Sequence, residues 1–278
     1  MMVRTLERLQ HVYASEGIRG VGRRLARRFH ATTVTSGTAE PESKLALDAG
    51  DYWTESSDDE FIRDQSHWLG HGRYSDERVW RSIGQSHRRL VETACQLAER
   101  KEPIRHMLEW GPGGGANAVA FTDQLETFTG VDISQPNLQQ CGRQLIAEGF
   151  GGFHPIVIEP DAPEHVLEAC RQPIDLFLCT AVYQHFPGKQ YGERVTRLAA
   201  QLLDTNGVAL IQTRYDDGTR KYSAKTNNYR AHASYFTSYA IDEFWAIASD
   251  AGLEPLAVRL NTKVKYAYYL LKNRAGTN

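Results

Sequence analysis

The sequence has few cysteines, and none of them lie at the spacing of a metal site. The four are Cys95, Cys141, Cys170 and Cys179. Without a CxxC pair, neither a zinc site nor a disulfide framework is indicated. No run of 18 apolar residues occurs, so no transmembrane helix is expected, and no apolar segment follows the basic start as a signal peptide would require. These absences favour a cytoplasmic protein with reduced thiols.

The chain also lacks an excess of positive charge. It has 32 Lys and Arg against 34 Asp and Glu, and a formal net charge of −2. A nucleic-acid-binding surface needs a basic excess, so no nucleic-acid partner is predicted. Residues 1–31 are the exception, with seven arginines, two glutamates and apolar residues at helical spacing. This pattern predicts a basic helix, either a solvated arm or an attachment to a membrane surface or protein partner. Nothing in the sequence indicates the oligomeric state.

Three segments differ in pattern. Residues 1–48 are a basic arm followed by a polar linker, residues 49–104 have helical periodicity, and residues 105–278 alternate apolar runs with helical patterns. Such alternation is typical of βαβ units around a parallel sheet. We expect a helix to start after Gly115 and the last two strands to pair antiparallel. The predicted strands are 106–110, 127–131, 155–158, 174–180, 207–213, 254–260 and 264–271.

A glycine-rich segment follows the first predicted strand. Gly111, Gly113, Gly114 and Gly115 leave the backbone without Cβ atoms, so a ligand can approach the main chain there. The next strand ends in Asp132, whose carboxylate can accept both hydroxyl protons of a ribose. This pair of features predicts a nucleotide-like cofactor. The alternative is that the glycines only turn the chain and Asp132 caps a helix.

An acid followed by GxGxG at the end of a strand resembles the class I S-adenosylmethionine (SAM) dependent methyltransferases, over about residues 105–273. The resemblance implies an α/β fold with a Rossmann-like, seven-stranded, mostly parallel sheet in the order 3-2-1-4-5-7-6. The last strand of this sheet is antiparallel. A helical N-terminal cap, residues 49–104, precedes the sheet. By position, Glu109 holds the amino group of the methionine moiety through the loop, Asp132 binds the ribose and Ile133 packs on the adenine. The other implied cofactor residues are Gly111, Gly113, Gly115, Asp161 and Ala162.

The resemblance leaves the methyl acceptor open. Thr180–Tyr183 departs from the Asn/Asp-Pro-Pro-aromatic motif of the branch that methylates nucleobases. Two regions could form an acceptor pocket, the aromatic and histidine-rich residues 52–80 and the long loop 215–237. The loop mixes hydroxyl-bearing rings with amides and acids, which suits a polyhydroxylated acceptor such as a sugar or glycoside. Arg73 is expected to meet the methionine carboxylate. The expected substrate-binding residues are His71, Tyr74, Tyr215 and Tyr235.

His185, just past the fourth predicted strand, is the expected general base. A neutral imidazole, with an ordinary pKa of about 6.5, suits removal of a hydroxyl proton. Tyr183, Asp217 and His71 are the alternative bases. Asp216 and Asp217 beside His185 also leave a divalent metal open. Other functions remain possible: methylation of a protein side chain or another metabolite, a nicotinamide-dependent dehydrogenase, or a catalytically idle binding protein.

Overall fold

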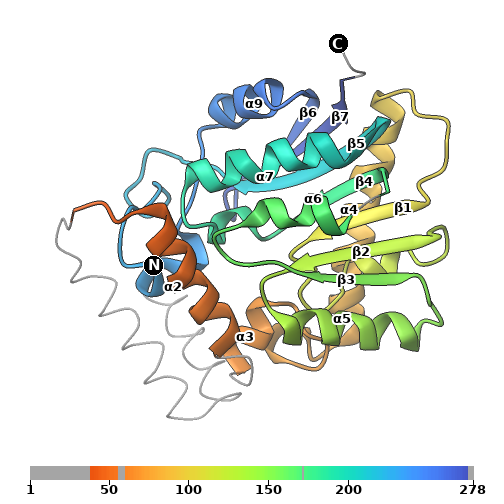
Figure 1. Cartoon of the computed structure of the whole chain (residues 1–278), viewed down its shortest axis with the longest axis horizontal. Coiled ribbons are helices and arrows are strands. Elements are labelled where there is room, and N and C mark those ends of the chain that lie inside the picture. Colours follow the sequence, from red (N-terminus) through yellow and green to blue (C-terminus); the bar gives the residue numbers. More distant parts are fainter. Residues whose placement is uncertain (1–37, 56–59, 171, 275–278) are drawn as a thin grey trace.

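A seven-stranded sheet forms the centre of the molecule (Figure 1), and its order is β3-β2-β1-β4-β5-β7-β6. The computed structural model describes residues 38–55, 60–170 and 172–274, so the basic helix predicted over residues 1–31 lies outside them. β7 is antiparallel to both its neighbours, and the other pairs are parallel. The predicted fold class is therefore confirmed. The strands are β1 His106–Trp110, β2 Thr127–Asp132, β3 Phe153–Val157, β4 Ile174–Cys179, β5 Leu203–Arg214, β6 Leu253–Asn261 and β7 Tyr266–Asn273.

Helices cover both faces of the sheet. Apolar residues of α4 and α5 pack on one face, and those of α6, α7 and α9 pack on the other. β1 and β4 are almost entirely buried, as their continuous apolar runs require when both faces are covered. Helix α2 begins inside the segment predicted as arm and linker. The helices are α2 Glu42–Glu55, α3 Glu60–Gln65, α4 Glu77–Leu97, α5 Gln135–Ala147, α6 Val166–Ala169, α7 Lys189–Leu202, α8 Tyr229–His232 and α9 Ile241–Asp250.

The α-helix predicted directly after Gly115 is absent, and a single 3-10 turn, Ala118–Ala120, stands in its place. Helix α4 explains the difference, because it packs closely on this segment. A Cβ atom at Gly84 would lie 2.3 Å from the Ala116 carbonyl oxygen. Arg88 donates to the carbonyl oxygen of Ala120 at 2.7 Å, so a side chain satisfies this acceptor where a longer helix would use an amide.

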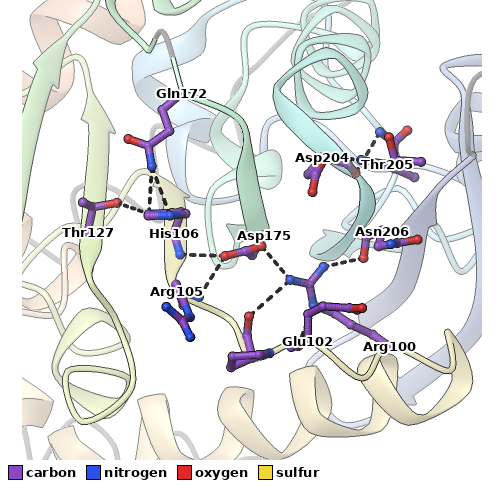
Figure 2. Close-up of polar contacts among 12 residues, drawn as sticks. Arg100, Glu102, Arg105, His106, Thr127, Gln172, Asp175, Asp204, Thr205 and Asn206 are labelled. Carbon is purple, nitrogen blue, oxygen red and sulfur yellow. Dashed lines mark hydrogen bonds and ion pairs between the residues drawn. The ribbon is translucent and has the colours of Figure 1, made fainter.

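The edge of the sheet at the amino ends of β1 and β4 is held by a buried ion pair (Figure 2). Arg100 donates to Asp175 Oδ1 at 2.6 Å, and the Arg100 side chain is only 3% exposed. The other oxygen of Asp175 accepts the amides of Arg105 and His106, both at 2.8 Å. Arg100 also donates to the carbonyl of Asn206 at the start of β5. The Arg100–Asp175 pair therefore joins the end of the cap to β1, β4 and β5.

We expect Asp175→Ala to lower the free energy of unfolding by about 3–5 kcal/mol, because it leaves a buried guanidinium and two amides without their acceptor. Urea denaturation measures this loss. The matched control is Glu126→Ala, which breaks the exposed pair with Arg105 and should cost no more than about 1 kcal/mol. Equal losses in the two variants would contradict the role assigned to Asp175.

Candidate functional site

A cavity lies at the carboxyl ends of β1, β2 and β4, at the edge of the sheet opposite the Arg100–Asp175 pair. It encloses about 890 Å³, the open space at its mouth included. The strand ends contribute Glu109, Asp132 and Thr180, while α2 contributes Ala46, Ala49 and Trp53. Ligands of open α/β sheets bind at this edge.

The glycine-rich loop after β1 packs directly against the cap. Gly111, Gly113 and Gly115 have φ values of 71°, 52° and 86°, which are unfavourable for other residues. A Cβ atom on Gly113 would lie 2.3 Å from the carbonyl oxygen of Ser66, and one on Gly114 would lie 2.5 Å from that of His67. The sequence suggested that glycine leaves room here for a ligand. In the structure these two missing Cβ atoms leave room for the cap.

Glu109 at the end of β1 is buried and half-satisfied. Its Oε1 accepts a hydrogen bond from Asn117 Nδ2 at 2.5 Å, while Oε2 has no partner among the described residues. Burial raises the pKa of Glu109 to about 8. His87 of α4 contacts Asn117 Oδ1 through its Nδ1 at 2.8 Å. The cap thus orients Asn117, and Glu109, which lines the cavity, keeps one buried oxygen without a hydrogen-bond partner among the described residues.

Asp132 at the end of β2 has a similar link to the cap. Its Oδ1 accepts the amide of Ser134 at 2.9 Å, and its Oδ2 accepts Asn137 Nδ2 at 3.3 Å. Trp68 Nε1 donates to Asn137 Oδ1 at 2.9 Å. Burial raises the pKa of Asp132 to about 6, despite these hydrogen bonds. Asn137 therefore connects the cap to the second carboxylate, as Asn117 connects it to Glu109.

His185 lies in the 3-10 turn Tyr183–His185 after β4 and lines the cavity. Its Nδ1 lies 2.5 Å from the carbonyl oxygen of Ala233, which only a protonated Nδ1 can satisfy. Nε2 then carries the lone pair, 3.2 Å from the Gln184 side-chain nitrogen. Burial lowers the pKa of His185 to about 4, so the ring is a neutral base at pH 7. The indole of Trp53 packs edge-on against it at 4.8 Å.

Among the other predicted cofactor residues, Gly111, Gly113 and Ile133 line the cavity. Gly115 packs on Cys141. Asp161 is exposed, and Pro160 lines the cavity where Asp161 and Ala162 were expected.

Arg73 does not line the cavity. Its Nε donates to both carboxylate oxygens of Asp64, at 3.1 and 3.0 Å, and 59% of its side chain is exposed. His71 pairs with Glu60 at 2.6 Å, also away from the cavity. Tyr74 packs against the ring of His67, which does line the cavity.

The remaining predicted residues from β4 to α9 lie outside the cavity lining. The Tyr183 hydroxyl contacts Thr196 at 2.8 Å within the core, and Tyr215 belongs to the apolar cluster on the α7 and α9 face of the sheet. Tyr235 packs near His232. Asp217 pairs with Lys265 at 3.3 Å. Within the described ranges, no three acidic, histidine or cysteine side chains gather as a metal site would require.

Several cavity residues carry no sequence signal that would assign them. Ala46, Ala49 and Trp53 repeat at helical spacing on one face of α2 and cover the cavity. Asn117 precedes a 3-10 turn and Asn137 lies in α5. Their contacts with Glu109 and Asp132 are visible only in the folded chain. Trp68 does lie in the aromatic-rich stretch 52–80.

Comparisons with known proteins agree with this geometry. Residues 108–211 match a family described as methyltransferase domain, and no curated protein matches the chain. Three similar solved structures are methyltransferases. Magnesium protoporphyrin IX methyltransferase from Synechocystis PCC 6803 is 15% identical, with a TM-score of 0.55 and coverage of 81% of this chain and 97% of its own. The CcbJ methyltransferase from Streptomyces caelestis is 18% identical, with a TM-score of 0.51 and coverage of 66% and 88%.

The third is a SAM-dependent methyltransferase from Clostridium acetobutylicum ATCC 824, which is 10% identical, with a TM-score of 0.51 and coverage of 66% and 89%. At such identities the likeness establishes the fold. The fold of this chain is therefore that of the SAM-dependent methyltransferases, and residues 108–211 match a methyltransferase domain in sequence. No helix among the residues that the structure describes is both long and apolar enough to cross a membrane.

The raised pKa of Glu109 gives a prediction for stability. Between pH 4.5 and about 8 the unfolded chain releases this proton while the folded protein retains it, so the free energy of unfolding falls as the pH rises. Glu109→Gln keeps the acceptor for Asn117 and removes the ionisation. Relative to wild type, the variant should gain roughly 3–5 kcal/mol over this range in urea denaturation at several pH values. If the difference in the free energy of unfolding between the variant and wild type did not change with pH, Glu109 would have the same pKa in the folded and unfolded chain.

Proposed function

We propose that this protein is a SAM-dependent methyltransferase, with residues 105–278 as its catalytic domain, that methylates a hydroxyl of a small polar molecule. The unpartnered Oε2 of Glu109 supports this proposal most directly, because a buried acceptor on a residue that lines the cavity requires a donor. An ammonium group supplies one and favours the ionised carboxylate. The Synechocystis structure, whose fold this chain shares, contains bound SAH, the demethylated product of SAM.

Different cavity residues are proposed to bind different parts of the cofactor. We assign the amino group to Glu109, the ribose hydroxyls to Asp132 and one face of the adenine to Ile133. Pro160, beside α2, is well placed for the adenine edge. Asp161, Ala162 and Arg73 remain predictions as cofactor residues, although none of them lines the cavity.

His185 is the proposed general base. When bound, SAM supplies a methyl group on a positively charged sulfur, which leaves as a neutral thioether. The hydroxyl oxygen of the acceptor must lose its proton as it attacks, and His185 Nε2 takes it once the acceptor hydroxyl replaces the amide of Gln184 at its lone pair. The Ala233 carbonyl stabilises the protonated ring through Nδ1. Tyr183 and Asp217 are weaker candidates. The Tyr183 hydroxyl is bound to Thr196, and the Asp217 carboxylate pairs with Lys265.

A sugar or glycoside remains the predicted acceptor, together with the roles of His71, Tyr74, Tyr215 and Tyr235 in binding it. A protein side chain or another metabolite is the alternative. A nicotinamide-dependent dehydrogenase is disfavoured, because its GxGxxG loop does not normally have an acid two residues before the first glycine. A divalent metal is left open.

Calorimetric titration with SAM, SAH and NAD tests the cofactor. We expect SAM and SAH to bind and NAD not to bind. Binding of the ammonium should displace the proton of Glu109, so titrations in buffers of different ionisation enthalpy should reveal proton release at pH 7. Glu109→Gln should weaken SAM binding roughly 10- to 100-fold and reduce this release. NAD binding in place of SAM would overturn the proposal.

Substitution of His185 tests the base. His185→Ala should keep the affinity for SAM and lower turnover by roughly 10² to 10⁴, measured as SAH formation with a competent acceptor. Because the pKa of His185 is lowered to about 4, the turnover of the wild-type protein should fall only near pH 4, below the 6.5 of an ordinary histidine. Tyr183→Phe is the matched control and should retain turnover. If only Tyr183→Phe were inactive, the base would have to be reassigned.

A further inference from the structure

Arg214, the last residue of β5, is a partly buried cation with few partners. Its Nη2 donates to the Tyr266 hydroxyl at 3.3 Å, and its Nε is buried with no hydrogen-bond partner among the described residues. No described carboxylate lies within ion-pair distance of it. By contrast, Arg73, Arg100 and Arg194 each contact a carboxylate.

Two tyrosine rings lie near this guanidinium. Its central carbon lies 5.5 Å from the ring centre of Tyr222 and 5.0 Å from that of Tyr266. Such cation–π contacts favour one orientation of the guanidinium, and its Nε is buried. Withdrawing a cation from water is costly unless an anion or hydrogen bonds compensate it. The compensating group is therefore expected to come from a ligand.

Arg214 is close to the proposed base. Gln212, two residues earlier on the same face of β5, accepts the amide of Ala181 through its Oε1 at 3.2 Å. Gln184 donates to the carbonyl of Ala181 at 3.1 Å and contacts His185 Nε2 at 3.2 Å. The charge of Arg214 also helps to lower the pKa of His185. Gln212 and Gln184 thus meet at Ala181, beside the base, and Arg214 lies two residues after Gln212 on β5.

The two glutamines have unused polar atoms as well. Gln212 Nε2, a donor, and Gln184 Oε1, an acceptor, are both buried without hydrogen-bond partners among the described residues. Gln212 is 2% exposed and Gln184 is 3% exposed. Buried polar groups are normally satisfied. Two free donors, Arg214 Nε and Gln212 Nε2, therefore lie on one face of β5, with a free acceptor beside them.

We propose that Arg214 and Gln212 bind an oxyanion of the methyl acceptor, so that the substrate is a hydroxylated molecule carrying a carboxylate or a phosphate. This inference rests on the proposed methyltransferase function. Arg214 donates from Nε to the oxyanion, and Gln212 adds a donor from the same face. Anchored there, the acceptor is held with its hydroxyl toward His185. Gln184 Oε1 can accept from a second hydroxyl.

Matched ligand pairs test the proposal. Each pair has one framework with and without the anion: glucuronate against glucose, glucose 6-phosphate against glucose, and 4-hydroxybenzoate against 4-hydroxybenzamide. Calorimetry on the full chain, with and without saturating SAH, measures binding. In at least one pair the anionic member should bind roughly 10- to 100-fold more tightly. The pair that responds distinguishes carboxylate from phosphate and sugar from aromatic framework.

Arg214→Gln should abolish this preference and leave the affinity for SAH unchanged. Arg214→Lys keeps the charge without the Nε donor and should retain part of the preference, which covers the case in which Arg214→Gln does not fold. The matched control is Arg197→Gln, an exposed arginine on α7, which should behave as wild type. The proposal is overturned if no anionic ligand binds better than its neutral partner, or if both Arg214 variants keep the full preference. Failure of SAH to bind wild type would instead refute the cofactor assignment.

Discussion

The close packing of the cap on the glycine-rich loop is the constraint on which the site depends. The carbonyl oxygen of Ser66 occupies the space that a Cβ atom on Gly113 would need. The carbonyl oxygen of His67 does the same at Gly114. The Gly114 amide donates to the carbonyl oxygen of Ser66 at 2.7 Å, and Trp80 Nε1 of α4 donates to the carbonyl oxygen of His67 at 2.6 Å. These contacts hold the cap against the carboxyl ends of β1 and β2. A side chain at either glycine would separate the two.

This packing determines the electrostatics of the cavity. With the cap in place, Glu109 and Asp132 are withdrawn from water, and the pKa of each rises. The cap also supplies His87 and Trp68, which orient the two asparagines that hold these carboxylates. A neutral Glu109 is inexpensive to bury in the free protein, and an arriving ammonium restores its charge. The same structure therefore stabilises the empty site and favours a cationic ligand.

The alternation of apolar runs and helical patterns predicts where the strands lie, and the resemblance to the SAM-dependent methyltransferases implies their order. Glu109 and Asp132 could be located because each ends a strand, and parallel strands bring their ends to one edge. Arg73 could not be placed, because its direction depends on Asp64, a contact within the cap. Tyr215 continues the alternation of β5 into the apolar cluster on the α7 and α9 face of the sheet, and the exact strand register decides this. The helix expected after Gly115 is prevented by α4, a tertiary effect that local pattern does not contain.

The central claim is that Glu109 holds the amino group of the cofactor and Asp132 its ribose, beneath the cap. A crystal structure of the full chain with SAH tests it most directly. The amino group of SAH is expected about 3 Å from Glu109 Oε2, with the ribose hydroxyls on Asp132 and Ser66–Trp68 still packed on the glycine loop. SAH bound elsewhere, or bound with its amino group away from Glu109 and the cap displaced from Gly113, would contradict the claim.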